Sequence, residues 1–163
     1  NIQIESILTY LEQELQATNI RVQDCPDLAI LSDTHRIVRS IENLLSTRYP
    51  NLSIITTSEN QNQYDTILSH YNNNENDPRF DRDIKQLRRT KKVHFTIDTN
   101  AIKLSTIKSY KGLEAKNVVV IVEENCDSAT LYTGLTRAKN NLIIINLGNQ
   151  IFDPFFRRYM PNN

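Results

Sequence analysis

The segment that decides the fold is TIKSYKGLEAKNVVVIV, residues 106–122. It ends in an uninterrupted apolar run, 118–122. A strand that is apolar on both faces usually lies in the centre of a parallel sheet, where helices cover both sides. One of only three glycines in the chain, Gly112, stands just before this run, between Lys111 and Leu113-Glu114. The segment therefore predicts a central strand that is preceded by a specialised turn.

The rest of the chain alternates between strand-like and helix-like patterns. Strands are expected at 28–32, 52–57, 93–98, 102–109, 117–123 and 141–147. Helices are expected at 2–17, 35–48, 62–71, 81–90 and 128–139, with Asp33 or Thr34 capping the second and Ser128 the last. Residues 2–17 carry apolar residues at i, i+3, i+4 and i+7, and residues 35–48 place five apolar residues on one helical face. Strands alternating with helices at these lengths predict an α/β fold with a mainly parallel sheet.

Composition limits the class of protein but does not identify a partner. The 163 residues suffice for one domain with a core, and 39% of them are hydrophobic. Lys plus Arg and Asp plus Glu both number 19, so any nucleic-acid footprint must be local. A dense basic run lies at 82–92, directly after several acids. Its default interpretation is a solvated, self-paired helix, and the alternative is a patch that tracks phosphates.

Several features favour a cytoplasmic protein without a metal site. Cys25 and Cys126 are far apart and form no CxxC, as expected of reduced thiols. No apolar run approaches the about 20 residues that cross a bilayer, and no signal-peptide pattern opens the chain. The three histidines have no ligand spacing. Because the first residue is Asn1 and not Met, we expect a fragment of a longer chain.

Two blocks of sequence carry a family resemblance. Residues 104–114, LSTIKSYKGLE, resemble motif V of superfamily 1 helicases of the UvrD/Rep type, which typically reads T-x-H-x-x-K-G-L-E. Residues 131–138, LYTGLTRA, resemble motif VI of that family, usually L-x-Y-V-A-x-T-R-A. A weaker third block, 28–33, is placed like the strand that opens motif IV. Together they resemble the second RecA-like motor domain of these helicases.

The resemblance implies a function and a nucleotide site. The fold would be a RecA-like three-layer sandwich with helices on both faces. The chain would be the C-terminal motor domain of an ATP-dependent DNA or RNA helicase or translocase. Arg137 would act as an arginine finger on ATP-Mg²⁺ that an N-terminal RecA-like domain mainly holds. Gly112 and Lys111 would face that nucleotide, and Glu114 would accept a hydrogen bond from a ribose hydroxyl. An Arg137 side chain packed away from the ligand-bearing rim of the sheet and tied up inside its own domain would contradict this role.

The resemblance also implies a contact with single-stranded nucleic acid, with DNA favoured over RNA. Thr106, Lys108 and Ser109 lie at the end of a predicted strand, and ligands of open α/β sheets gather outside the carboxyl ends of strands. Lys108 occupies the position where the family usually has histidine. A lysine still neutralises a phosphate, although base stacking is lost.

Some features of the family pattern are missing. No G-x-x-x-x-G-K-[ST] motif is present, so the chain would supply only half of an ATP site and would not hydrolyse ATP alone. Ser32-Asp33 replaces the phosphate-contacting arginine of motif IV, for which Arg36 or Arg39 could substitute. We interpret 58–100 as a reduced form of the insertion that relatives carry, and 1–24 as an N-terminal amphipathic helix and linker.

Two other classes of function stay open at this stage. One is a degenerate, non-catalytic helicase-like domain that binds protein or nucleic acid. The other is a stand-alone α/β domain such as a receiver, for which Asp33 is the only suitably placed acid.

On the helix that carries Arg137, we expect a buried face made of Leu131, Tyr132, Leu135 and Ala138.

Overall fold

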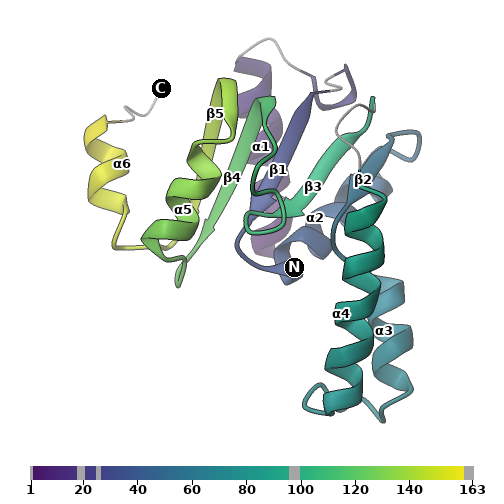
Figure 1. Ribbon diagram of the computed structural model, residues 1–163. Helices are drawn as coiled ribbons and strands as arrows, with labels where there is room; N and C mark the ends of the chain where they lie inside the picture. The colour runs from purple at the N-terminus through teal and green to yellow at the C-terminus, as the bar shows by residue number, and fades with distance from the viewer. Residues whose placement is uncertain (1, 18–20, 25–26, 96–99, 160–163) are drawn as a thin grey trace.

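A five-stranded, all-parallel sheet forms the centre of the protein (Figure 1). The computed structural model describes residues 2–17, 21–24, 27–95 and 100–159. In these, the strand order is β2-β3-β1-β4-β5. The strands are β1 (Leu28–Ser32), β2 (Ile54–Thr56), β3 (Ile102–Thr106), β4 (Ala115–Glu123) and β5 (Ala138–Leu147). The predicted α/β class with a mainly parallel sheet is therefore confirmed.

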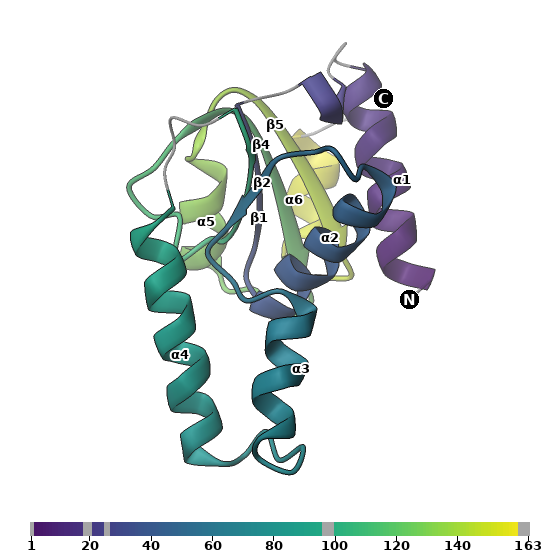
Figure 2. The same ribbon diagram turned by 90° about the vertical axis from the view of Figure 1, so that its right-hand side faces the viewer.

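Helices cover both faces of this sheet, as a RecA-like sandwich requires. In the described part of the chain they are α1 (Ile2–Ala17), α2 (His35–Arg48), α3 (Gln61–Ser69), α4 (Pro78–Val93), α5 (Ser128–Leu135) and α6 (Asp153–Tyr159), with a short 3-10 helix at Val22–Asp24. Figure 2 shows α1 and α2 on one side of the sheet and α5 on the other. The three-layer arrangement is confirmed.

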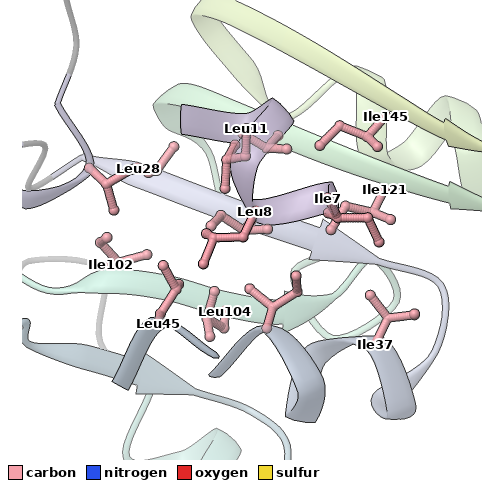
Figure 3. Packing of buried hydrophobic residues seen from close by; sticks show 14 of the residues in the cluster. Ile7, Leu8, Leu11, Leu28, Ile37, Leu45, Ile102, Leu104, Ile121 and Ile145 are labelled. Carbon is pink, nitrogen blue, oxygen red and sulfur yellow. The ribbon is translucent and has the colours of Figure 1, made fainter. Parts of the chain in front are cut away.

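The apolar run of β4 is buried because both faces of that strand are covered. Val119 and Ile121 belong to a core cluster that α1 and α2 share with the sheet, which Figure 3 shows around Leu8 and Leu11. Val118 and Val120 point into a second cluster beneath α5. Successive side chains of a strand point to opposite faces, so an unbroken apolar run fills both cores at once.

Parallel pairing gives the sheet two chemically different edges. Ser32, Thr106 and Glu123 end their strands together at the carboxyl edge. Ala115 pairs with Ala138 at the opposite, amino edge. Residues 107–114, which we call the crossover loop, run from the first edge to the second across the face that α5 covers. The crossover loop thereby contributes residues to both edges.

Helices α3 and α4 form a hairpin that projects beyond the carboxyl edge (Figures 1 and 2). Asn60 begins α3 with a capping box to Gln63, and Asp77 caps α4 with Pro78 at its first position. Phe80 packs edge-on between two tyrosines, Tyr64 and Tyr71. The hairpin occupies the segment interpreted as a reduced insertion, and that interpretation stays a prediction.

The hairpin is joined to the body by a buried ionic cluster. The Glu59 carboxylate is fully buried and accepts hydrogen bonds from Arg39 of α2 and from Arg88 of α4, the latter at 2.6 and 2.8 Å. The Arg39 guanidinium also stacks over the Tyr64 ring at 3.8 Å. His35 contacts Ser58 nearby, with 2.7 Å between Nδ1 and Oγ. Elements far apart in sequence therefore meet at one carboxylate.

We predict an acid-sensitive stability from His35 in this cluster. Burial, together with the charges of Arg88 and Arg39 and against that of Glu59, lowers the pKa of His35 to about 4. The unfolded imidazole, with a pKa of about 6.5, binds a proton first as the pH falls. Stability should therefore decrease between pH 6.5 and 4, by up to about 1.4 kcal/mol per pH unit. Urea unfolding at several pH values should show this contribution, and His35→Asn should remove it. An equal slope in the variant would contradict the assignment.

Several predicted boundaries were wrong. The strand predicted at 102–109 ends at Thr106, where the crossover loop begins. Helix α4 extends from Pro78 to Val93, beyond the predicted 81–90 at both ends, so Val93 does not begin a strand. His94 and Phe95 are not in a strand either, and 96–98, the rest of the strand predicted at 93–98, lie outside the described residues. Helix α5 ends at Leu135, and Ala138 already belongs to β5. Its N-cap is Asp127, whose carboxylate accepts from the Thr130 amide, and not Ser128. Strand pairing with Ala115 overrides helical propensity at Ala138.

No helix in the described ranges is long and apolar enough to cross a membrane.

Candidate nucleotide and nucleic-acid site

The predicted site residues lie in two groups at opposite edges of the sheet. Gly112, Glu114 and Arg137 gather at the amino edge, where the Ala115 amide donates to the Arg137 carbonyl. The residues predicted to contact nucleic acid lie at the carboxyl edge, at the end of β3. The expectation that ligand-binding residues gather at the carboxyl edge therefore applies to the second group alone.

The Arg137 guanidinium is held by neutral oxygens of its own domain. Its Nε donates to the Thr133 carbonyl at 2.9 Å, and Nη2 donates to the Thr136 hydroxyl at 2.9 Å. Nη1 makes a longer bond, 3.4 Å, to the Leu113 carbonyl in the crossover loop. Arg137 thus connects the end of α5 to the turn that follows Gly112.

These contacts leave the charge of Arg137 uncompensated. Among the described residues, no carboxylate forms an ion pair with it, and the residue is half-buried. A guanidinium carries five N–H donors, of which the three bonds above occupy three. The side chain is therefore tied up inside its own domain, at the edge opposite the carboxyl ends of the strands, which is the arrangement stated above to count against a finger role. The three bonds leave two donors, and the proposal of a finger role rests on these donors and on the charge.

Glu114 and Lys111 lie on the exposed part of this edge. The Glu114 carboxylate is half exposed and pairs with Lys139, with 3.2 Å between Oε2 and Nζ. Surface ion pairs of this kind contribute little to stability, so the carboxylate can exchange its partner for a ligand hydroxyl. Lys111 is exposed.

Gly112 has a left-handed backbone conformation, which fits the specialised turn predicted before the apolar run. Its φ is +88°, and a Cβ built on it would meet nothing within 4 Å. The turn therefore requires glycine for its conformation, while the space beside it is open for a ligand.

Gly148 provides a matched control for this turn. It also has a positive φ, +91°, with open space around it, but follows β5 at the carboxyl edge. We predict that Gly112→Ala and Gly148→Ala each cost about 1–2 kcal/mol of stability. Only Gly112→Ala should also lower ATP turnover, by about 10²-fold, since small displacements of positioning groups are that costly. Urea unfolding of residues 1–163, and ATPase assays of a protein that also carries the expected N-terminal RecA-like domain, test this. Equal activity in the two variants would refute a nucleotide-facing role for Gly112.

The group at the carboxyl edge is partly buried. Thr106 is 3% exposed, and its hydroxyl accepts a hydrogen bond from the Ser109 amide at 3.3 Å. Thr106 therefore shapes the turn in this structure and does not face solvent. Lys108 is exposed and Ser109 is half-buried. Of the three predicted nucleic-acid contacts, Lys108 is the one whose side chain is freely accessible.

An acidic pair occupies the position of the missing motif IV arginine. Asp33 follows β1, and Glu123 ends the neighbouring β4. Burial and the nearby Glu123 raise the pKa of Asp33 to about 6. Arg36 pairs with Glu123 at 2.7 Å and is mostly exposed. Arg39 is committed to Glu59, so the structure gives no support to Arg39 as the substitute arginine.

The sequence analysis did not predict how closely α5 packs on the crossover loop. Gly134 lets this helix approach the crossover loop closely: an added Cβ would lie 3.2 Å from Cδ1 of Ile107 and 3.4 Å from Cγ1 of Val120. The predicted buried face was partly wrong, because Leu131 is buried but Tyr132 is 70% exposed. The glycine at position 134, within a helix of apolar residues, was the available signal for close packing.

Comparison with known protein families supports the resemblance. The family model of the UvrD-like helicase C-terminal domain matches residues 102–145. This range runs from β3 to β5 and contains both groups of predicted site residues. The predicted resemblance to a UvrD-like helicase C-terminal domain is confirmed by this match, which indicates a helicase family. The search of curated proteins found no match.

Proposed function

We propose that this chain is the C-terminal motor domain of an ATP-dependent helicase or translocase. The observation that carries the proposal is the convergence, within the matched segment, of Arg137 and the Gly112–Glu114 turn at one edge of the sheet. A guanidinium with no carboxylate partner among the described residues suits a γ-phosphate that gains charge during transfer. Glu114 suits a ribose hydroxyl.

In this proposal the chain completes a site whose other half belongs to an N-terminal RecA-like domain. That domain would hold ATP and Mg²⁺, which supply the phosphoryl group and neutralise its charge. The residues of this chain would orient and stabilise the nucleotide from the opposite side of the interface. Lys108, at the other edge of the sheet, would contact the backbone of single-stranded nucleic acid, with DNA the first candidate.

The test compares two proteins. Residues 1–163 alone should show no ATP turnover above background, whereas a protein that carries both motor domains should hydrolyse ATP and be stimulated by single-stranded DNA. Robust turnover by residues 1–163 alone would contradict the proposal.

A second candidate is a degenerate domain that binds nucleic acid or protein without ATP chemistry. Asp33 and Glu123 favour it, because acids stand where a phosphate-contacting arginine is expected. A two-domain protein that binds single-stranded DNA but hydrolyses no ATP would favour this candidate.

A further inference from the structure

Helix α4 concentrates positive charge in a chain whose formal net charge is zero. Its sixteen residues include seven basic and two acidic side chains. The helix projects with α3 from the body of the domain (Figure 2). A local excess of one sign on a projecting element attracts a polyanion even when the whole protein is neutral.

Four of these basic residues share one exposed face, which we call the α4 stripe: Arg82, Lys85, Arg89 and Lys92. They are three or four residues apart, so they follow each other at about 4.5–6 Å along the helix. The apolar side chains Phe80 and Ile84 are buried on the other side. The stripe therefore faces solvent along its whole length of about 15 Å.

The residues of the α4 stripe differ in whether they form ion pairs. Arg82 pairs with Asp83 and Lys85 with Asp81, in exposed contacts of 3.1 and 2.7 Å that contribute little. This part of the predicted self-paired helix is confirmed. Arg89 and Lys92 form no ion pair within the described ranges of the chain. Compensation of the helix dipole explains a basic residue in the last turn such as Lys92, but not Arg89 in the turn before it.

The end of the stripe lies beside the crossover loop. Phe95, just after α4, contacts the Tyr110 ring edge-on, with 6.1 Å between ring centroids. Tyr110 is two residues from Lys108, the exposed lysine at the carboxyl edge. A polyanion held at Lys108 could therefore continue along the hairpin.

We infer that the α4 stripe is a second contact for the phosphate backbone of single-stranded nucleic acid, continuous with the contact at Lys108. This inference rests on the proposed function. It commits to a nucleic acid and not to an acidic protein, because the stripe leads to the proposed nucleic-acid contact and presents cations at regular intervals. It requires no base recognition and is independent of ATP.

The experiment measures binding of fluorescein-labelled oligothymidylate to residues 1–163 by anisotropy, over a range of salt concentrations. The test variant is Arg89→Glu with Lys92→Glu. The control, Lys116→Glu with Arg158→Glu, changes the net charge equally at exposed positions away from α4. We expect the test variant to bind about tenfold or more weakly and its logarithmic salt slope to fall by about 1.4, at 0.7 per phosphate contact. The control should match the wild type.

The outcomes separate this inference from the proposed function. If Lys108→Ala weakens binding but the α4 variant behaves like the control, the stripe is not a nucleic-acid contact, while the proposed function stands. If the wild type shows no salt-dependent binding, the inference and the proposed contact at Lys108 are wrong, whereas the proposed ATP site is decided by the turnover of the two-domain protein. If polyglutamate competes as well as oligothymidylate at equal charge, the stripe selects acidic chains in general, which overturns the inference. Far-UV circular dichroism verifies that the variants are folded.

Discussion

Replacing Arg137 with alanine is expected to reduce ATP turnover of the two-domain protein by about 10³-fold or more. Arginine fingers contribute roughly 10³–10⁵ in rate because they stabilise charge that develops on the transferred phosphoryl group. The guanidinium of Arg137 is held by the Thr133 carbonyl and the Thr136 hydroxyl, so its direction is fixed before a nucleotide arrives. Nucleic-acid-stimulated ATPase assays measure the effect.

The Arg137→Lys variant tests whether a positive charge alone is enough or the planar donor geometry of arginine is also needed. Lysine keeps the positive charge but has no planar donor fork, so it cannot hold these contacts and also present two donors to a phosphate. We expect most of the activity to be lost in this variant as well. Arg158→Ala, at an exposed position on α6, is the control. Turnover of Arg137→Ala within about threefold of the wild type would exclude the finger role, since such residues contribute far more.

Glu59→Ala is expected to destabilise the domain by about 3–5 kcal/mol. Removing one partner from a buried ionic cluster leaves the remaining charges buried and uncompensated. In this variant both Arg39 and Arg88 lose their carboxylate partner, and the two guanidiniums would face each other without it. Urea unfolding should report the loss, and the α3–α4 hairpin should become susceptible to proteolysis first. Asp81→Ala, which breaks the exposed pair with Lys85, should cost less than about 1 kcal/mol.

A combined variant tests whether charge is the cause. Replacing all three members, by Arg39→Met, Glu59→Leu and Arg88→Met, should recover much of the stability lost in Glu59→Ala, because no unpaired charge remains. If the triple variant were as unstable as Glu59→Ala, the loss would reflect packing and not electrostatics. Although burial opposes it, hydrogen bonds from Arg88 lower the pKa of Glu59. The contribution of this carboxylate is therefore present above its unfolded pKa and lost as the pH falls through the folded value.

The sheet was predictable because its signals are local. The apolar run at 118–122 and the helical spacing of apolar residues at 2–17 indicate directly which side chains of these elements are buried. The end of α5 was not predictable in the same way. Whether Ala138 continues the helix or begins β5 depends on its pairing with Ala115, a residue distant in the sequence. A boundary that depends on pairing between distant residues is not marked by any periodic pattern in the local sequence.

The candidate site was predictable in its residues but not in its arrangement. The motifs identified Gly112 and Arg137, and the positive φ of Gly112 fits the expectation for that turn. The contact between Arg137 and the Leu113 carbonyl depends on how α5 packs on the crossover loop. The Arg39–Glu59–Arg88 cluster was missed because its members are 20 and 29 residues apart, and each is unremarkable in its own segment.

The far end of the hairpin offers a practical point of access to the molecule. Asn72 and Asn73 adopt left-handed backbone conformations, with φ of 52° and 58°, in the exposed turn that follows α3. Asparagine tolerates this conformation better than most residues, so the turn is already a local break in regular structure. A short labelling tag or surface anchor inserted between them would immobilise the protein by its tip. Both edges of the sheet would then remain open to the solution, so nucleotide and oligonucleotide could be supplied in turn to one tethered molecule.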